Sequence, residues 1–92
     1  MIGSFRCKHT AALYLGQRVA RFANIERVAL RKLRQIEIAA RLNDLRIPPS
    51  NHLEPLQGDR DGQYSLRIND QWRLCFTWHE GHAHLIEIID YH

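Results

Sequence analysis

Six side chains of this sequence combine an ability to hold an anion with an ability to move a proton. They are Glu54, Arg67, Arg73, Asp90, Tyr91 and His92. Arginine binds phosphate oxygens through a planar fork of donors and keeps its charge at neutral pH. Histidine titrates near neutrality, a carboxylate can orient its ring, and tyrosine can stack on a base. These residue types suit metal-free cleavage of an RNA phosphodiester, which needs a base for the ribose 2′-hydroxyl, cations for the charge developing at phosphorus, and an acid for the 5′ oxygen.

Three histidines lie close together and raise the alternative of a metal site. They are His79, His82 and His84. No cysteine or pair of acids completes a familiar ligand set, and the run spans a predicted turn. We interpret them as surface residues of a hairpin, and we expect no metal ion or other cofactor. The sequence also contains no P-loop, dinucleotide fingerprint or serine elbow.

The arginines are positioned by alternating apolar and polar residues in two predicted strands, 64–68 and 72–78. Residues that pair directly across two strands share a face of the sheet, so apolar residues must meet apolar residues. A two-residue turn breaks this rule, whereas a three-residue turn at 69–71 satisfies it. The register that follows sets Arg67 directly opposite Arg73.

Like charges side by side on one sheet face are unfavourable, so the facing arginines need an explanation. Either acids such as Glu87 or Asp90 neutralise them, or the two guanidinium groups form an anion site. We favour the anion site, because a protein built only for stability would rarely place two arginines together.

A last strand is expected at 83–91, after a turn at Glu80 and Gly81. Apolar residues occupy both of its faces, so a two-residue and a three-residue turn both remain open. Either register returns Asp90, Tyr91 and His92 to the end of the sheet that holds the arginine pair. The sequence therefore predicts one cluster of these residues.

A helix is the clearest element of the first half of the chain. Its apolar residues recur at helical spacing on one side, at Ile25, Ala29, Leu33, Ile36 and Ala40, and Asn24 is the expected N-cap. Four arginines fall on the opposite side, at Arg27, Arg31, Arg34 and Arg41. They serve either solubility alone or contact with the phosphate backbone of RNA, including ribosomal RNA.

The remaining segments complete an α+β pattern. We expect a short strand at 1–6, a brief helix at 10–16, an edge strand at 52–56 that contains Pro55, and a turn at 58–62. The element order is then β-α-α-β-β-β-β, with two helices on a small, mainly antiparallel sheet. The 92 residues suit one domain spanning 1–92.

Composition and charge narrow the function classes. The net charge is +3, but residues 1–50 carry +7 and residues 51–92 carry −4, which favours a polyanionic partner for the first half. The absence of a signal peptide pattern and of a long apolar run predicts a cytoplasmic protein. Cys7 and Cys75 belong to no Cys-x-x-Cys pair and are expected to be buried or half-buried thiols rather than a disulfide.

These residues together resemble the HigB branch of the RelE toxin superfamily, also described as plasmid-maintenance killer proteins. The resemblance is carried by LNDLRIPPSNHLEPLQGDRDGQYSLRINDQWRLCF and IEIIDYH, and MIGSFRC and VALRKL are similar too. It implies a compact α+β fold with two helices against a small antiparallel sheet. It further implies the toxin of a type II toxin–antitoxin system, an endoribonuclease that cleaves messenger RNA on the ribosome. The implied partner is a HigA-like helix-turn-helix antitoxin.

The resemblance also assigns roles within the predicted cluster. Arg67 and Arg73 would hold the scissile phosphate, His92 would transfer a proton, and Asp90 and Tyr91 would support it. Some members of the superfamily carry histidine or lysine on the short strand after the proline loop, whereas this sequence has Glu54 and Gln57. Either Glu54 is the base, or His92 and the arginines act alone.

Two other functions would fit the same chain. The ParE branch of this superfamily contains non-catalytic inhibitors of DNA gyrase, but such an inhibitor needs no proton-transfer group. A plain RNA-binding module would explain the arginine helix and would leave its RNA uncut.

Overall fold

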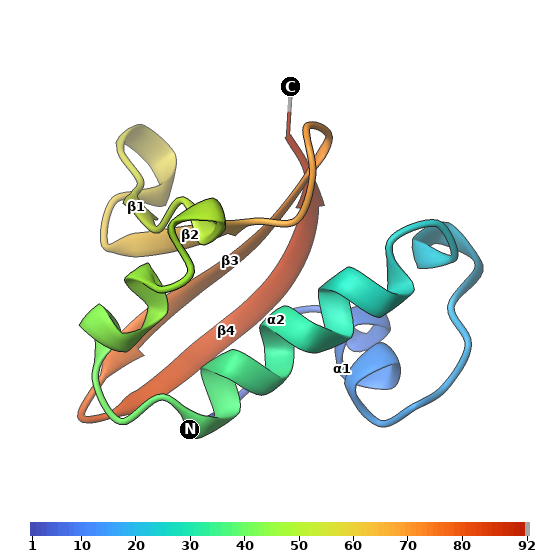
Figure 1. Cartoon of the computed structure of the whole chain (residues 1–92), viewed down its shortest axis with the longest axis horizontal. Coiled ribbons are helices and arrows are strands. Elements are labelled where there is room, and N and C mark those ends of the chain that lie inside the picture. Colours follow the sequence, from blue (N-terminus) through green and yellow to red (C-terminus); the bar gives the residue numbers. More distant parts are fainter. Residues whose placement is uncertain (92) are drawn as a thin grey trace.

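The computed structural model describes residues 1–91, which form two α-helices on one face of a four-stranded antiparallel sheet (Figure 1). The helices are α1 (Lys8–Tyr14) and α2 (Glu26–Ile38), and the strands follow each other in space as in sequence: β1 (Glu54–Pro55), β2 (Gln63–Arg67), β3 (Trp72–His79) and β4 (His82–Asp90). Short 3₁₀ turns join them: η1 (Ala20–Phe22), η2 (Leu42–Arg46), η3 (Pro49–Asn51) and η4 (Gly58–Arg60). The predicted α+β class is confirmed.

The first residues do not form the full strand that the sequence predicts. Instead, Ile2 and Phe5 each make a single parallel bridge to β4, at Ala83 and Ile86. The backbone amide of Ile2 donates a hydrogen bond to the carboxylate of Glu37 at 3.1 Å. The N-terminal segment thus covers the free edge of β4 through isolated contacts, since an edge strand offers unpaired backbone groups.

Helix α2 is shorter than its sequence pattern predicts. Its N-cap is Ile25 and not Asn24, and it ends at Ile38, so Ala40 and Arg41 lie beyond it. The carboxylate of Asp44 accepts the amides of Ala40 and Arg41, both at 3.0 Å, and turns the chain into η2. The hydrogen bond from Arg41 and that from Ala40 outweigh desolvation and lower the pKa of Asp44.

The hairpin of β2 and β3 has the predicted register. Leu66 pairs with Leu74 and Arg67 with Arg73, and the three-residue loop 69–71 joins the strands. The side chain of Asn69 accepts the amides of residues 71 and 72 at 2.9 and 2.8 Å and fixes the loop. The prediction from residue parity is therefore confirmed.

A β-bulge settles the register of β4, which the sequence left open. His79 pairs with His82 across the two-residue turn Glu80–Gly81, where both φ angles are positive, as a tight hairpin turn requires. Further along, the register shifts between Cys75 and Thr77, opposite the segment around Leu85, which has a φ of 54°. The extra residue resets the alternation, so apolar groups occur on both faces of one strand.

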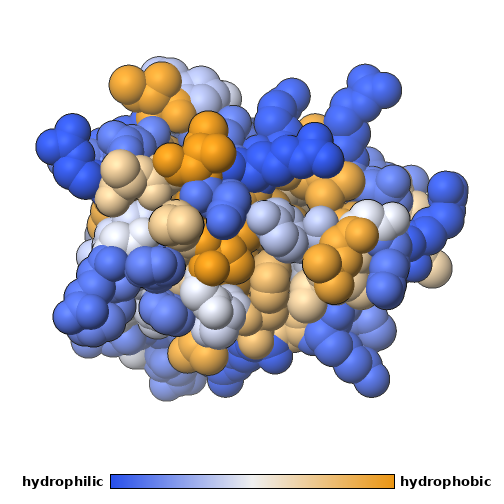
Figure 2. Space-filling model, turned by 90° about the horizontal axis from the view of Figure 1, so that it is seen from below, coloured by the Kyte–Doolittle hydropathy of each residue, from blue (hydrophilic) through white to orange (hydrophobic). Residues whose placement is uncertain are grey.

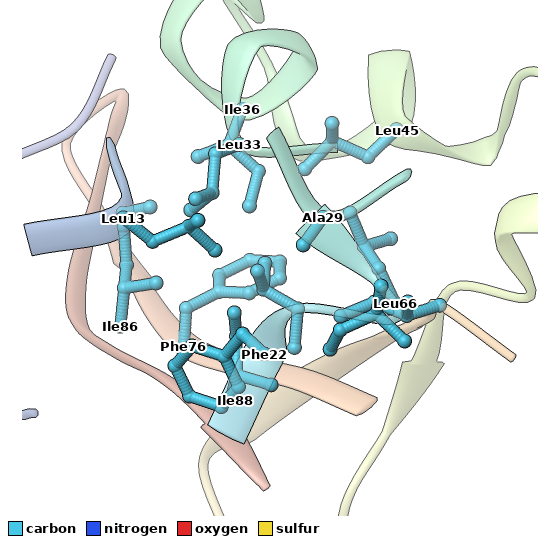
Figure 3. Close-up of a cluster of buried hydrophobic side chains, with 14 of the residues drawn as sticks. Leu13, Phe22, Ala29, Leu33, Ile36, Leu45, Leu66, Phe76, Ile86 and Ile88 are labelled. Atoms are coloured by element: carbon cyan, nitrogen blue, oxygen red, sulfur yellow. The ribbon is translucent and has the colours of Figure 1, made fainter. Parts of the chain in front are cut away.

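The core lies between α2 and the inner face of the sheet. Leu33 and Ile36 of α2 converge with Phe76 and Ile86 of the sheet, around Phe22 (Figure 3), and all five are fully buried. Both cysteines are free thiols, Cys75 buried and Cys7 partly buried, as expected. In residues 1–91, no helix has the length and apolar content that crossing a bilayer requires.

Candidate active site

The facing arginines lie on the outer face of the sheet, away from the helices. Arg67 and Arg73 are direct partners in the β2–β3 ladder, and both are partly buried. Their neighbours Leu66 and Leu74 point into the core and are fully buried, so alternation turns both guanidinium groups outward. The two cations share one surface.

Both guanidinium groups are anchored by the loop that joins their strands. Arg67 forms an ion pair with Asp70 through Nη2, and Arg73 donates from Nη1 to the backbone oxygen of Asn69 at 2.8 Å. The Cζ atom of Arg73 lies 5.2 Å from the centre of the Tyr91 ring. Among residues 1–91, one nitrogen of each group makes these bonds, so other donors remain for an anion.

The end of β4 comes back to this loop, as predicted. The amide of Tyr91 donates to the backbone oxygen of Gln71 at 2.6 Å, and the side chain of Gln71 donates to Asp90 at 3.1 Å. Asp90 pairs with Trp72, so it is on the face opposite Arg73, whereas Tyr91 is on the side of Arg73. His92 lies outside the described residues.

A row of side chains crosses all four strands next to the arginine pair. The ladder pairs Glu54 with Ser65, Ser65 with Cys75, and Cys75 with Glu87. Because direct partners share a face, this row is on the same outer face as Arg67, two residues further along the strands. Glu54 is exposed at one end of the row, which is compatible with the role of a base.

Arg60 is a residue of this surface that the sequence reasoning missed. From η4 it reaches across the sheet, and its Nη1 donates to Glu87 at 2.8 Å and to Gln63 at 3.1 Å. The hydrogen bond to Glu87 raises the pKa of Arg60. Beneath lies Cys75, whose burial raises its thiol pKa to about 11. No local pattern links residues 60 and 87, so the sequence carried no signal for this contact.

Lys32 is a second residue that the sequence reasoning missed, although a signal for it existed. It lies three residues after Ala29 and four before Ile36, which is the buried side of α2. Its side chain is 3% exposed and donates from Nζ to the side chain of Asn51, which is itself fully buried. Burial, together with the charges of nearby arginines, lowers the pKa of Lys32.

The arginines of the first half lie on another surface. Three of them are exposed on α2, and Arg41 is exposed at the start of η2: Arg27, Arg31, Arg34 and Arg41. Figure 2 shows the molecule from the lower side of the view in Figure 1, the side on which α2 lies. Hydrophilic side chains surround a few exposed apolar residues there. Helix α2 packs on the inner face of the sheet, so this basic surface and the arginine pair lie on opposite sides of it.

The histidines of the β3–β4 hairpin are spread over its end. The rings of His82 and His84 are 6.1 Å apart, and His79 lies beside Glu80. Among residues 1–91, no group of three His, Cys, Asp or Glu side chains is arranged to hold a metal ion. The geometry of the outer face instead offers fixed cations, a ring and a carboxylate.

Two curated relatives are similar to part of this chain. "Toxin HigB-1" of Vibrio cholerae is 44% identical over 61 residues, which is 66% of this chain and 64% of that protein. "Endoribonuclease HigB" of Proteus vulgaris is 40% identical over 40 residues, 44% of each chain. The matches therefore span less than two thirds of the length of either relative.

Solved structures share the fold over nearly the whole chain. The toxin–antitoxin complex YoeB–YefM from Staphylococcus aureus superposes with a TM-score of 0.62 at 20% identity, covering 100% of this chain and 98% of that one. The protein YafQ from E. coli reaches 0.59 at 14% identity, covering 98% of this chain and 93% of that one. Residues 4–92 match the family model described as the RelE-like toxin of type II toxin–antitoxin system HigB. The chain belongs to this HigB-like toxin family.

Proposed function

We propose that this protein is the toxin of a type II toxin–antitoxin system and acts as a ribosome-dependent, metal-independent endoribonuclease that cleaves messenger RNA and stops translation. The observation that carries the proposal is the pair Arg67 and Arg73, held on one open sheet face beside the ring of Tyr91. Two fixed cations on neighbouring strands can bind the non-bridging oxygens of one phosphodiester. Family membership and the name of the Proteus vulgaris relative support the same activity.

In the proposed reaction, the 2′-oxygen of ribose attacks the adjacent phosphorus and the bond from phosphorus to the 5′ oxygen breaks. A base removes the 2′ proton and an acid protonates the leaving 5′ oxygen. Arg67 and Arg73 stabilise the charge on the pentavalent phosphorus, while the ring of Tyr91 stacks on a nucleobase of the RNA. His92 is assigned to proton transfer, with Glu54 as the second proton-transfer group. Asp90 is on the face opposite Arg73, so its support is assigned to holding the 69–71 loop through Gln71.

Two partners belong to this proposal. The first is a HigA-like helix-turn-helix antitoxin, supported by the family and by the toxin–antitoxin complex with the same fold. The second is the ribosome, with the exposed arginines at 27, 31, 34 and 41 contacting ribosomal RNA. A ribosomal target places the activity in the cytoplasm.

Arg73→Ala tests the function. It should lower the rate of messenger cleavage on translating ribosomes by about 10²–10³-fold, the scale of losing one donor to transition-state charge. Arg18→Ala, which changes an exposed arginine away from the outer sheet face, is the matched control and should cleave normally. Undiminished cleavage by the Arg73→Ala protein would refute the assigned roles, and an SOS response with intact transcripts would favour a gyrase inhibitor instead.

A further inference from the structure

The outer face of the sheet carries a third guanidinium group close to the facing pair. The arginine pair occupies one row of the ladder, and Cys75 and Glu87 occupy the neighbouring row on the same face. Arg60 reaches the second row, where its Nη1 lies 2.8 Å from Glu87. Two residues along a strand span about 6.7 Å, which is the scale of one nucleotide in an extended RNA strand.

Arg60 is held firmly but retains free donors. Both of its hydrogen bonds, to Glu87 and to Gln63, use Nη1. Its Nε and Nη2 groups make no further bond among residues 1–91, and its side chain is 34% exposed. The side chain of Glu87 is less exposed, at 16%, and its carboxylate is held by the guanidinium group. An anion approaching this row therefore meets the cation first.

We propose that Arg60 binds the phosphate one nucleotide away from the scissile phosphate, which makes the outer face a site for at least two successive phosphates. This inference rests on the proposed function, because it takes the pair Arg67 and Arg73 as the cradle of the scissile phosphate. Glu87 orients Arg60 through Nη1, and the outward nitrogens bind the RNA. An arginine already fixed by a carboxylate loses little side-chain entropy on binding.

The test combines variants of the protein with messengers of altered charge. Ribosomes are programmed with a messenger that has a 2′-deoxy nucleotide at the cleavage position, so that binding is measured without cleavage. Two further messengers carry a neutral methylphosphonate, one at the phosphate on the 5′ side of the scissile phosphate and one at the phosphate on its 3′ side. Arg60→Met should weaken binding of the protein to ribosomes that carry the messenger without methylphosphonate. The expected loss is about tenfold, the scale of one charge-assisted hydrogen bond.

On one of the two methylphosphonate messengers, Arg60→Met should cause no further loss, because the contact is already absent. The slope of log K against log salt should also fall by about 0.7, as expected for one phosphate of a single strand. Additive losses on both modified messengers, or an unchanged salt slope, would overturn the proposal. A purely structural role moves the melting temperature and leaves the salt slope alone.

Two variants separate phosphate binding from the neutralisation of Glu87. Glu87→Gln keeps the cation and should bind the messenger at least as tightly as the wild type. The double variant Arg60→Met/Glu87→Gln removes both charges and should stay about tenfold weak. If it instead binds like the wild type, Arg60 serves only to mask Glu87 and the proposal fails. If the wild-type protein does not cleave an all-ribose messenger on the ribosome, the proposed function is refuted. The binding measurements still decide the role of Arg60 in that case.

Discussion

Asn51→Leu should be severely destabilising, because it leaves the buried ammonium group of Lys32 without its partner. Lys32 is 3% exposed, and its Nζ donates to the side-chain oxygen of Asn51, which is 0% exposed. The amide nitrogen of Asn51 in turn donates to Gln35 at 2.9 Å and to the backbone oxygen of Leu45 at 3.1 Å. This network fastens α2 to the segment that leads into β1.

The magnitude follows from the burial of the charge. Removing one partner of a buried, hydrogen-bonded charge costs about 3–5 kcal/mol. A domain of this size has a free energy of unfolding of roughly 5–14 kcal/mol, so the substitution removes at least about a fifth of it. The melting temperature should fall by at least about 12 °C. Lys32→Met leaves only a neutral amide oxygen unpaired, which costs about 1–3 kcal/mol.

The double variant Lys32→Met/Asn51→Leu should therefore be more stable than Asn51→Leu alone. Urea denaturation followed by circular dichroism measures all four proteins of this cycle, with far-ultraviolet spectra as a control for the fold. Asn51→Leu within about 1 kcal/mol of the wild type, or a double variant less stable than Asn51→Leu, would refute the reasoning.

The pH dependence of the free energy of unfolding is an independent test of the buried charge of Lys32. Burial lowers the pKa of Lys32 below its ordinary value of 10.5, so the folded protein gives up this proton at lower pH than the unfolded chain does. The free energy of unfolding should then rise with pH between the folded pKa and 10.5. Lys32→Met should lack this rise. An equal pH dependence in both proteins would contradict the burial of a charged lysine.

Two further predictions concern the thiols and the basic surface. Burial raises the pKa of Cys75 to about 11. For Cys7, burial raises the pKa, but hydrogen bonds from the first turn of α1 lower it by more, so the pKa of Cys7 is below its ordinary value. A thiol reagent at pH 8 should thus modify Cys7 alone in the folded protein and both cysteines in denaturant; rapid modification of Cys75 in the folded protein would be the contrary result. Arg31→Glu/Arg34→Glu should weaken sedimentation with ribosomes at low salt while the melting temperature stays the same, and unchanged sedimentation would discard this docking surface.

Local pattern was enough to predict the pairing of the two arginines at the centre of the candidate site. The alternation in 64–68 and 72–78 allows one turn length that keeps apolar residues together, and that turn places Arg67 opposite Arg73. Such a register depends on residues close in sequence, so it can be derived without knowing the rest of the fold. The buried side of α2 was predictable for the same reason, since Leu33 and Ile36 follow the period of the helix.

Hydrogen bonds, ion pairs and a bulge that periodicity does not report decided the rest. The end of α2 depends on the carboxylate of Asp44, and the facing of β4 depends on the bulge at Leu85. The ion pair of Arg60 with Glu87 joins residues 27 positions apart, and the partner of Lys32 comes from a loop 19 positions away. Periodicity reports which side of an element is apolar, but a hydrogen bond or an ion pair needs two atoms within about 3 Å of each other. Only the packing of η4 against the sheet and of η3 against α2 brings those atoms together.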